Sequence, residues 1–182
     1  MMKNNYIDNY LKKYSTVLKN YNLKDFLKIA QILNKVKKNK KKVILVGNGG
    51  SAAMASHVSV DLTKMCKIRA INFNEADLLT CFSNDYGYEN WTWRAISYHA
   101  DKKDLVICIS SSGESKNIIN AAKFAKKIGC DVVTLTGFKK ANKVKKIGHV
   151  NLWIDSKNYN FIEMTHHIWL LSIVDMIAKA KF

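Results

Sequence analysis

The chain has 182 residues, of which 48% are hydrophobic and 24% are charged, and this composition is typical of a folded globular domain. It argues against a globally disordered chain, and its length favours one domain with a full core. The net charge of +16 comes almost entirely from lysine, so it indicates a compositional bias as much as a binding function.

The densest lysine run, residues 35–42, favours a solvated helix end over a nucleic-acid site, because no aromatic residues interleave it. We therefore expect neither a nucleic-acid partner nor a membrane partner, although the positive field favours an anionic substrate. No apolar run approaches the ~20 residues of a membrane span, and the N-terminus lacks the apolar core of a secretory signal. The four cysteines include no C-x-x-C pair and indicate reduced structural thiols. The expected location is the cytoplasm.

Taken in chain order, the hydrophobic pattern predicts two amphipathic helices followed by alternating strands and helices. The helical patterns cover residues 7–18, 23–33, 51–65, 115–128 and 160–179. Short apolar runs predict strands at residues 43–47, 68–73, 105–110, 131–137 and 150–154. This alternation predicts a parallel sheet in one α/β domain over residues 1–182, with a helical extension at 1–40 and the core at 41–182.

The last predicted helix is apolar around most of its circumference. Ile162, Trp169 and Ile173 mark one face, and Met164 and Ile168 extend the apolar surface around the helix. A helix that is apolar on most sides is buried on most sides. In a chain this small we expect part of it to be buried against another subunit, and hence a homo-oligomer.

A glycine-rich turn, residues 47–51, follows the first predicted strand and opens a helix. Glycines there allow close backbone approach by a ligand, and free N–H groups at a helix start attract anions. The turn also satisfies the dinucleotide pattern G-x-G-x-x-A, which expects an acid about 20 positions on. The second strand ends instead in Asn72-Phe73-Asn74, which weakens the dinucleotide alternative.

A second turn, with the sequence SSSGES at residues 110–115, follows the strand at 105–110. Capping a helix needs only one or two of its four hydroxyls. Four hydroxyls and a glycine, at the carboxyl end of a strand in an open sheet, favour an oxyanion cradle, most simply for phosphate.

Three motifs in this order, GNGGSA at 47–52, NDYGY at 84–88 and SSSGES at 110–115, resemble the sugar isomerase (SIS) domain family and, within it, the phosphoheptose isomerases. The resemblance implies a flavodoxin-like three-layer fold with a five-stranded parallel sheet. It also implies a homotetramer with active sites at subunit interfaces. The implied reaction interconverts sedoheptulose 7-phosphate and D-glycero-D-manno-heptose 7-phosphate, a step toward bacterial surface polysaccharides.

The resemblance also assigns roles to the residues of the three motifs. The phosphate would be held by Ser110, Ser111, Ser112 and Ser115. The sugar would be contacted by Asn48, Gly49, Gly50 and Ser51, together with Asn84 and Asp85, which we place in a polar loop. In the same segment Glu89 and Arg94 are interpreted as a structural pair.

Aldose–ketose isomerisation needs a base for the carbon-bound proton and a group that shuttles protons between oxygens. His57 and Asp61 are four residues apart on a predicted helix, so they share a face and can converge on one ligand. A packed polar pair explains this spacing equally well. The related isomerases have histidine and glutamate at these positions, so the carboxylate here is one methylene shorter.

The C-terminal helix departs further from the family pattern. Glu163 stands where the family has glutamine, and Leu171 stands where it has a catalytic or metal-binding histidine. His167, one turn after Glu163, can supply an imidazole instead. His57, Asp61, Glu163 and His167 are therefore the candidate ligands of a divalent metal such as zinc. We expect Asp61 or Glu163 to take the carbon-bound proton, with His57 polarising the substrate.

Two alternatives stay open at this point. The substitutions at positions 61, 163 and 171 allow another substrate or reaction on the same scaffold. A non-catalytic sugar-phosphate-binding module, as SIS domains form in some regulators, is the other. His166, next to His167, is expected to pack at a subunit interface.

Overall fold

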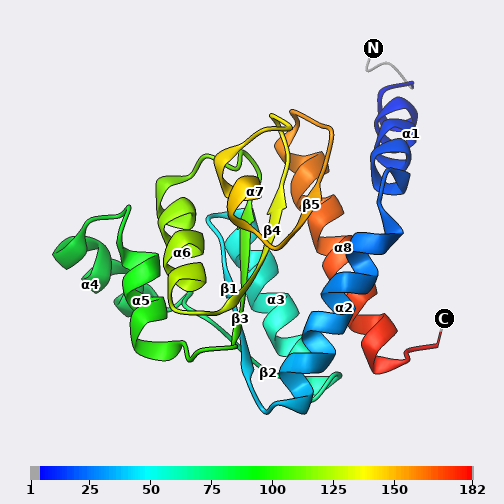
Figure 1. Cartoon of the computed structure of the whole chain (residues 1–182). Coiled ribbons are helices and arrows are strands. Elements are labelled where there is room, and N and C mark those ends of the chain that lie inside the picture. Colours follow the sequence, from blue (N-terminus) through cyan, green and yellow to red (C-terminus); the bar gives the residue numbers. More distant parts are fainter. Residues whose placement is uncertain (1–4, 182) are drawn as a thin grey trace.

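The computed structural model describes residues 5–181, and its centre is a five-stranded parallel sheet with helices on both faces (Figure 1). The predicted apolar runs form the strands β1 (Lys42–Val46), β2 (Arg69–Asn72), β3 (Leu105–Ser110), β4 (Asp131–Thr136) and β5 (Val150–Trp153). They pair in the order β2-β1-β3-β4-β5, every pair parallel. The expected flavodoxin-like α/β fold is confirmed.

Eight helices flank this sheet in the described part of the chain. They are α1 (Asn5–Lys19), α2 (Leu23–Lys38), α3 (Gly50–Lys64), α4 (Ala76–Tyr86), α5 (Trp91–His99), α6 (Lys116–Lys127), α7 (Lys143–Ile147) and α8 (Tyr159–Ala178). In Figure 1, α2, α3 and α8 cover one face of the sheet, and α5 and α6 cover the other.

Both faces of the sheet are buried, because successive side chains of a strand point to opposite sides. In β1, Val43 and Leu45 join the core beneath α2, α3 and α8, while Ile44 and Val46 join the core beneath α5 and α6. A continuous apolar run is therefore the pattern that such a strand requires.

The strand order creates a crevice at the carboxyl ends of β1 and β3. From β1 the chain moves outward through α3 to β2, and it then crosses back to β3 on the other side of β1. Open α/β sheets bind ligands outside the carboxyl ends of the strands where the order reverses in this way. The glycine turn follows β1 and the serine turn follows β3, so both motifs border this crevice.

Helix α4 corrects the prediction of a polar loop around Asn84. The segment is helical through Tyr86, yet none of the residues of α4 is buried, and the helix projects away from the sheet (Figure 1). Its apolar residues Leu78 and Phe82 pack only partly against the core. A short helix with so little burial has a weak hydrophobic pattern, and α7 escaped prediction for the same reason.

Helix α8 forms where a long apolar helix is predicted, and it also meets a membrane-span criterion although no apolar run of ~20 residues is present. It has 20 residues and a mean hydropathy of 1.2, enough by length and composition to cross a membrane. Phe161, Ile162 and Ile173 are buried in the chain, where α8 packs against α1, α2 and α3. We interpret α8 as a core helix, a class that passes the same test.

Candidate functional site

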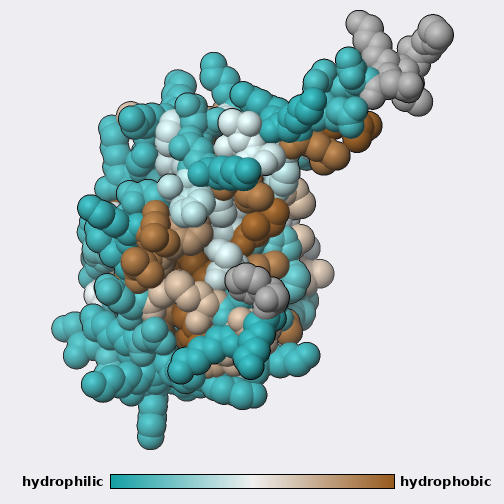
Figure 2. Space-filling view, turned by 90° about the vertical axis from the view of Figure 1, so that its right-hand side faces the viewer, coloured by the Kyte–Doolittle hydropathy of each residue, from teal (hydrophilic) through white to brown (hydrophobic). Residues whose placement is uncertain are grey.

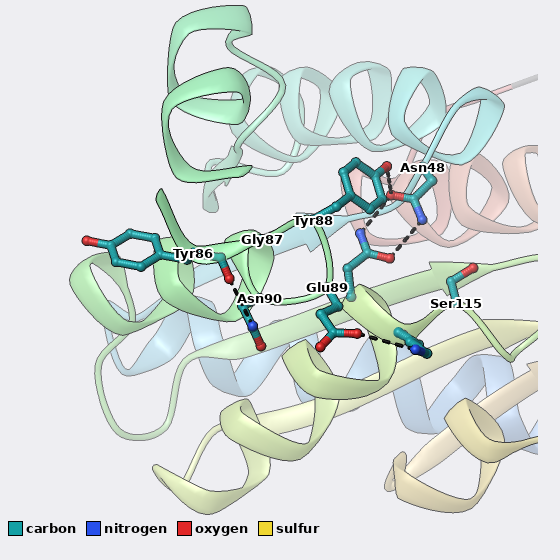
Figure 3. A pocket seen from close by; sticks show the side chains of 9 residues that line it. Asn48, Tyr86, Gly87, Tyr88, Glu89, Asn90 and Ser115 are labelled. Atoms are coloured by element: carbon teal, nitrogen blue, oxygen red, sulfur yellow. Dashed lines mark hydrogen bonds and ion pairs between the residues drawn. The ribbon is translucent and has the colours of Figure 1, made fainter. Parts of the chain in front are cut away.

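A cavity of about 670 Å³ lies at the crevice between the carboxyl ends of β1 and β3 (Figure 3). Its walls come from three segments: Asn48 of the glycine turn, residues 86–90 after α4, and residues 115–117 at the start of α6. A volume of this size is typical of small-molecule sites.

The glycine turn has a backbone that a larger residue would distort. Gly49 has φ +54°, and α3 begins after it without a side-chain cap. The N–H groups of Ser51 and Ala52 donate to the carbonyls of Asn48 and Gly49 at 3.0 and 2.9 Å, so the turn closes on itself through its backbone. A Cβ atom at Gly50 would run into the Glu163 carboxylate, so this glycine lets α8 approach the turn. Ser51, in contrast, is buried at 3% exposure and faces the protein interior.

In the serine turn, the hydroxyl of Ser110 donates to Ser115 Oγ at 3.3 Å, and Ser115 forms no cap bond to α6. The Ser111 hydroxyl is buried without a hydrogen-bond partner among the described residues. Ser112 instead accepts a bond from the Glu114 N–H at 3.2 Å. Two hydroxyls and an uncapped helix start therefore meet at this turn, an arrangement that suits an anion.

The segment at the start of α7 packs against the serine turn and stabilises its conformation. The Val144 N–H donates to the Gly113 carbonyl at 3.0 Å, and Lys143 Nζ lies 2.9 Å from a Glu114 carboxylate oxygen. Gly113 has φ +66°, and a Cβ there would overlap the side chain of Asn142, which is fully buried. The turn is thus held in one conformation by its packing.

Asn84 and Asp85 are not brought to this cavity within one chain. They lie in the last turn of α4, both exposed, and Asn84 Nδ2 donates to Asp85 Oδ1 at 3.0 Å. Sugar contacts from these two residues therefore stay a prediction.

His57, Asp61 and His167 form a hydrogen-bonded chain between α3 and α8. His57 Nε2 lies 3.2 Å from Asp61 Oδ2, and His57 Nδ1 lies 3.0 Å from His167 Nε2. Because a neutral imidazole donates from one nitrogen and accepts at the other, we assign Nε2–H of His57 to Asp61 and Nε2–H of His167 to His57. This assignment leaves Nδ1 of His167 as an acceptor at the end of the chain.

The surroundings favour a neutral His167. Its partial burial and the neighbouring His57 lower its pKa, while Asp61 acts in the opposite direction. Neutral imidazoles near physiological pH are suited to proton transfer.

Glu163 lies one turn before His167 on α8, with its carboxylate over Gly50 of the glycine turn. Burial raises its pKa. Two carboxylates therefore border the glycine turn and the histidine pair: Asp61 is bonded to His57, whereas Glu163 has no such ion pair in residues 5–181.

Comparisons with known proteins now identify the family. The profile of the SIS domain matches residues 5–137. The chain belongs to the SIS domain family. It is 35% identical over 156 residues to the phosphoheptose isomerase of Aliarcobacter butzleri, covering 82% of both chains. It is 31% identical over 180 residues to a probable phosphoheptose isomerase of Thermoplasma acidophilum, covering 95% of this chain and 97% of that one.

A solved phosphoheptose isomerase structure from Francisella tularensis has the same fold as this SIS domain. The TM-score is 0.90 at 22% identity, over 98% of this chain and 100% of that one. At this identity the comparison concerns the fold, and it agrees with the strand order described above.

The candidate acid–base residues of this SIS domain are not arranged as a metal site. Within residues 5–181, no group of three or more His, Cys, Asp and Glu side chains is placed to hold a metal ion. The donor types of His57, Asp61, His167 and Glu163 suit zinc, but both ring nitrogens of His57 are already engaged. Zinc binding therefore stays a prediction.

The remaining C-terminal positions have structural roles in this SIS domain. His166 is fully buried, and its Nε2 bonds the Thr136 carbonyl at 3.2 Å at the end of β4, so its packing role lies within the chain. Leu171, at the family's histidine position, packs against the core beneath α8.

Some residues of the cavity were missed by sequence reasoning. Asn117, one turn into α6, bonds Asn48, and Tyr88 reaches Asn48 from the loop after α4. Glu89 pairs with Lys116 at 3.4 Å, not with Arg94, which stacks on aromatic rings instead. Tyr88 is the last residue of the NDYGY motif and Glu89 follows it directly, so this motif was the sequence signal that could have indicated both residues.

Proposed function

We propose that this protein interconverts sedoheptulose 7-phosphate and D-glycero-D-manno-heptose 7-phosphate through an enediol. It is a phosphosugar isomerase, as its family and its relatives over most of the chain indicate. The hydrogen-bonded chain of Asp61, His57 and His167 beside the glycine turn carries the proposal, because it provides a proton shuttle despite Leu171.

The phosphate is bound by the serine turn in this proposal. Ser110 and Ser115 offer hydroxyls, and Ser111 offers a buried hydroxyl that has no hydrogen-bond partner in residues 5–181. The start of α6, which no side chain caps, offers N–H groups. Phosphate oxygens are strong acceptors and complement all of these donors. The sugar chain then extends past Asn48 toward Gly50 and Glu163.

Glu163 is the base that moves the carbon-bound proton. It takes a proton from C1 of the ketose, and the C–H electron pair forms the C1–C2 double bond while the C2 carbonyl pair moves onto O2. The proton then returns at C2 as the C1 carbonyl of the aldose forms. A raised pKa suits this task, since a base is most effective when its pKa lies near the working pH. Asp61, bonded to His57, is less free to act in this way.

The histidine pair moves the second proton, from O1 to O2 of the enediol. His167 accepts the O1 proton at Nδ1 and returns it from Nδ1 to O2. Between these two transfers the positive charge is shared with His57, whose imidazolium Asp61 orients and stabilises. Glu163 and His167 are one turn apart on α8, so both can face the same two carbons.

The oligomeric state and location belong to the same proposal. A homotetramer would bring Asn84 and Asp85 of a neighbouring copy toward the cavity, which their exposed positions on α4 allow. A cytoplasmic location fits a phosphorylated sugar substrate, and the product would supply heptose for surface polysaccharide.

An NMR assay tests the proposal. The protein is incubated with a panel of ketose phosphates, with EDTA or with added zinc, and formation of aldose phosphate is followed. We expect turnover of sedoheptulose 7-phosphate that persists in EDTA. Activity that EDTA abolishes and zinc restores would place a metal in the site. Binding without turnover of any ketose phosphate would instead support a sugar-phosphate-binding module.

A further inference from the structure

Tyr88 stands over the cavity on the loop between α4 and α5 (Figure 3). Although 54% of the residue is exposed, its hydroxyl donates to Asn48 Oδ1 at 3.1 Å. Water could satisfy an exposed hydroxyl, so this bond is not required for stability, yet it directs the hydroxyl onto a residue of the glycine turn.

The amide of Asn48 is held in one orientation by buried groups. Asn117 Nδ2 donates to Asn48 Oδ1 at 2.8 Å and also to Thr92 Oγ1 at 3.2 Å. Asn48 Nδ2 donates back to Asn117 Oδ1 at 3.0 Å. Asn117 is 2% exposed and Thr92 is fully buried, so this arrangement is part of the rigid core.

These bonds determine which donors and acceptors of Asn48 and Tyr88 remain free to bind a ligand. Asn48 Oδ1 already accepts two bonds, from Asn117 and from Tyr88. One N–H of Asn48 stays available as a donor. The proton of the Tyr88 hydroxyl is committed to Asn48, so its oxygen keeps lone pairs that can accept a bond.

We propose that Tyr88 and Asn48 together recognise one free hydroxyl of the substrate's sugar chain, which donates to Tyr88 Oη and accepts from Asn48 Nδ2. A hydroxyl can do both at once, whereas a carbonyl or a methylene cannot. The inference rests on the proposed function. It makes Tyr88 a specificity residue that selects polyhydroxylated sugar phosphates with a hydroxyl between the phosphate and the reacting carbons.

The test uses the full-length protein and two probes in calorimetry. One is sedoheptulose 7-phosphate reduced to the heptitol phosphate, which keeps hydroxyls and phosphate but cannot be isomerised. The other is inorganic phosphate. Tyr88→Phe removes only the hydroxyl oxygen. Tyr86→Phe is the matched control, because Tyr86 lines the same cavity while its hydroxyl points away from Asn48 (Figure 3).

We expect Tyr88→Phe to weaken heptitol phosphate binding about threefold to tenfold, the effect of one neutral hydrogen bond. Its affinity for inorganic phosphate, and both affinities of Tyr86→Phe, should match the unchanged protein. Equal binding of heptitol phosphate by Tyr88→Phe and the unchanged protein would overturn this inference alone, as would an equal loss for inorganic phosphate. An unchanged protein that binds phosphate but no sugar phosphate would overturn the proposed function as well.

Discussion

Asp61 and Glu163 are two carboxylates in different surroundings, and this difference assigns their roles. Asp61 accepts from His57, which orients the imidazole. Glu163 lies over Gly50, and burial raises its pKa. A carboxylate that is bonded to an imidazole and one that is not are suited to different parts of acid–base work.

Replacement of each carboxylate by its amide separates the two roles. We expect Glu163→Gln to lower kcat by about 10²- to 10⁴-fold with KM nearly unchanged, because the base is lost while the shape is kept. Asp61→Asn should also lower kcat, by a smaller factor, because it disturbs only the orientation of His57. The NMR assay measures both. A Glu163→Gln variant with the activity of the unchanged protein would exclude Glu163 as the base.

His166 makes the stability of the fold depend on pH. Burial lowers its pKa to about 3, whereas the unfolded chain has the ordinary value of 6.5. The unfolded state therefore binds the proton first, and the stabilisation present above pH 6.5 falls as the pH decreases toward 3. The loss is about 2 kcal/mol at pH 5 for this group.

Urea unfolding of the unchanged protein and of His166→Gln between pH 5 and pH 7.5 measures this contribution. Glutamine can still donate to the Thr136 carbonyl but does not titrate. We expect a shallower pH dependence in the variant. Identical slopes for the two proteins would mean that His166 is protonated in the folded state or reached by water.

At the scale of single elements, the serine turn owes its conformation to α7 as well as to its own hydroxyls. Gly113 is in the left-handed region, and Asn142 fills the space next to it. Asn142 also caps α7 by accepting the Lys145 N–H at 2.9 Å. The serine turn, the proposed phosphate site, is therefore held by two segments that are distant in sequence from the glycine turn.

Two glycine substitutions test this packing. Gly113→Ala adds a Cβ that overlaps Asn142, whereas Gly87→Ala, also at positive φ, adds one into open space. Both should cost about 1 kcal/mol or more of unfolding free energy through backbone strain. Only Gly113→Ala should also weaken inorganic phosphate binding, by about tenfold or more, as measured by calorimetry. Equal phosphate affinity in both variants would show that the turn does not depend on Asn142.

At the scale of the whole molecule, one apolar face is left uncovered by residues 5–181. Brown residues gather over the side that carries α1, α2 and α8 (Figure 2). Ile168 and Met176 of α8 and Leu23 and Leu27 of α2 are exposed there. A groove of about 380 Å³ runs between these helices. An apolar patch that several helices share is typical of a subunit interface.

We expect light scattering at micromolar concentration to give the mass of a tetramer of the 20.7 kDa chain. Replacing Ile168 and Met176 together with glutamate should produce smaller species, because charges would be buried without partners. Retained secondary structure by circular dichroism would show that the chain still folds. A monomeric unchanged protein would contradict the tetramer and the contribution of Asn84 and Asp85 from a neighbouring copy.

The sequence by itself determined the features that depend on neighbouring residues. The apolar run of β1 indicated a strand buried on both faces, and the glycine and serine turns indicated helix starts that can hold an anion. These signals are local, because strand burial, turn geometry and helix capping act over a few residues. They were sufficient to place both turns at the carboxyl ends of β1 and β3.

Only the tertiary structure decided which distant side chains meet. His57 and His167 touch because α8 packs along α3, and no local pattern specifies that helix packing. The bond of Asn117 to Asn48 likewise depends on the pairing of β1 with β3. Helix α4 lacks buried residues, so its weak pattern could not reveal that Asn84 lies on a projecting helix. Contacts between segments far apart in sequence depend on how whole elements pack, and that packing is a property of the complete fold.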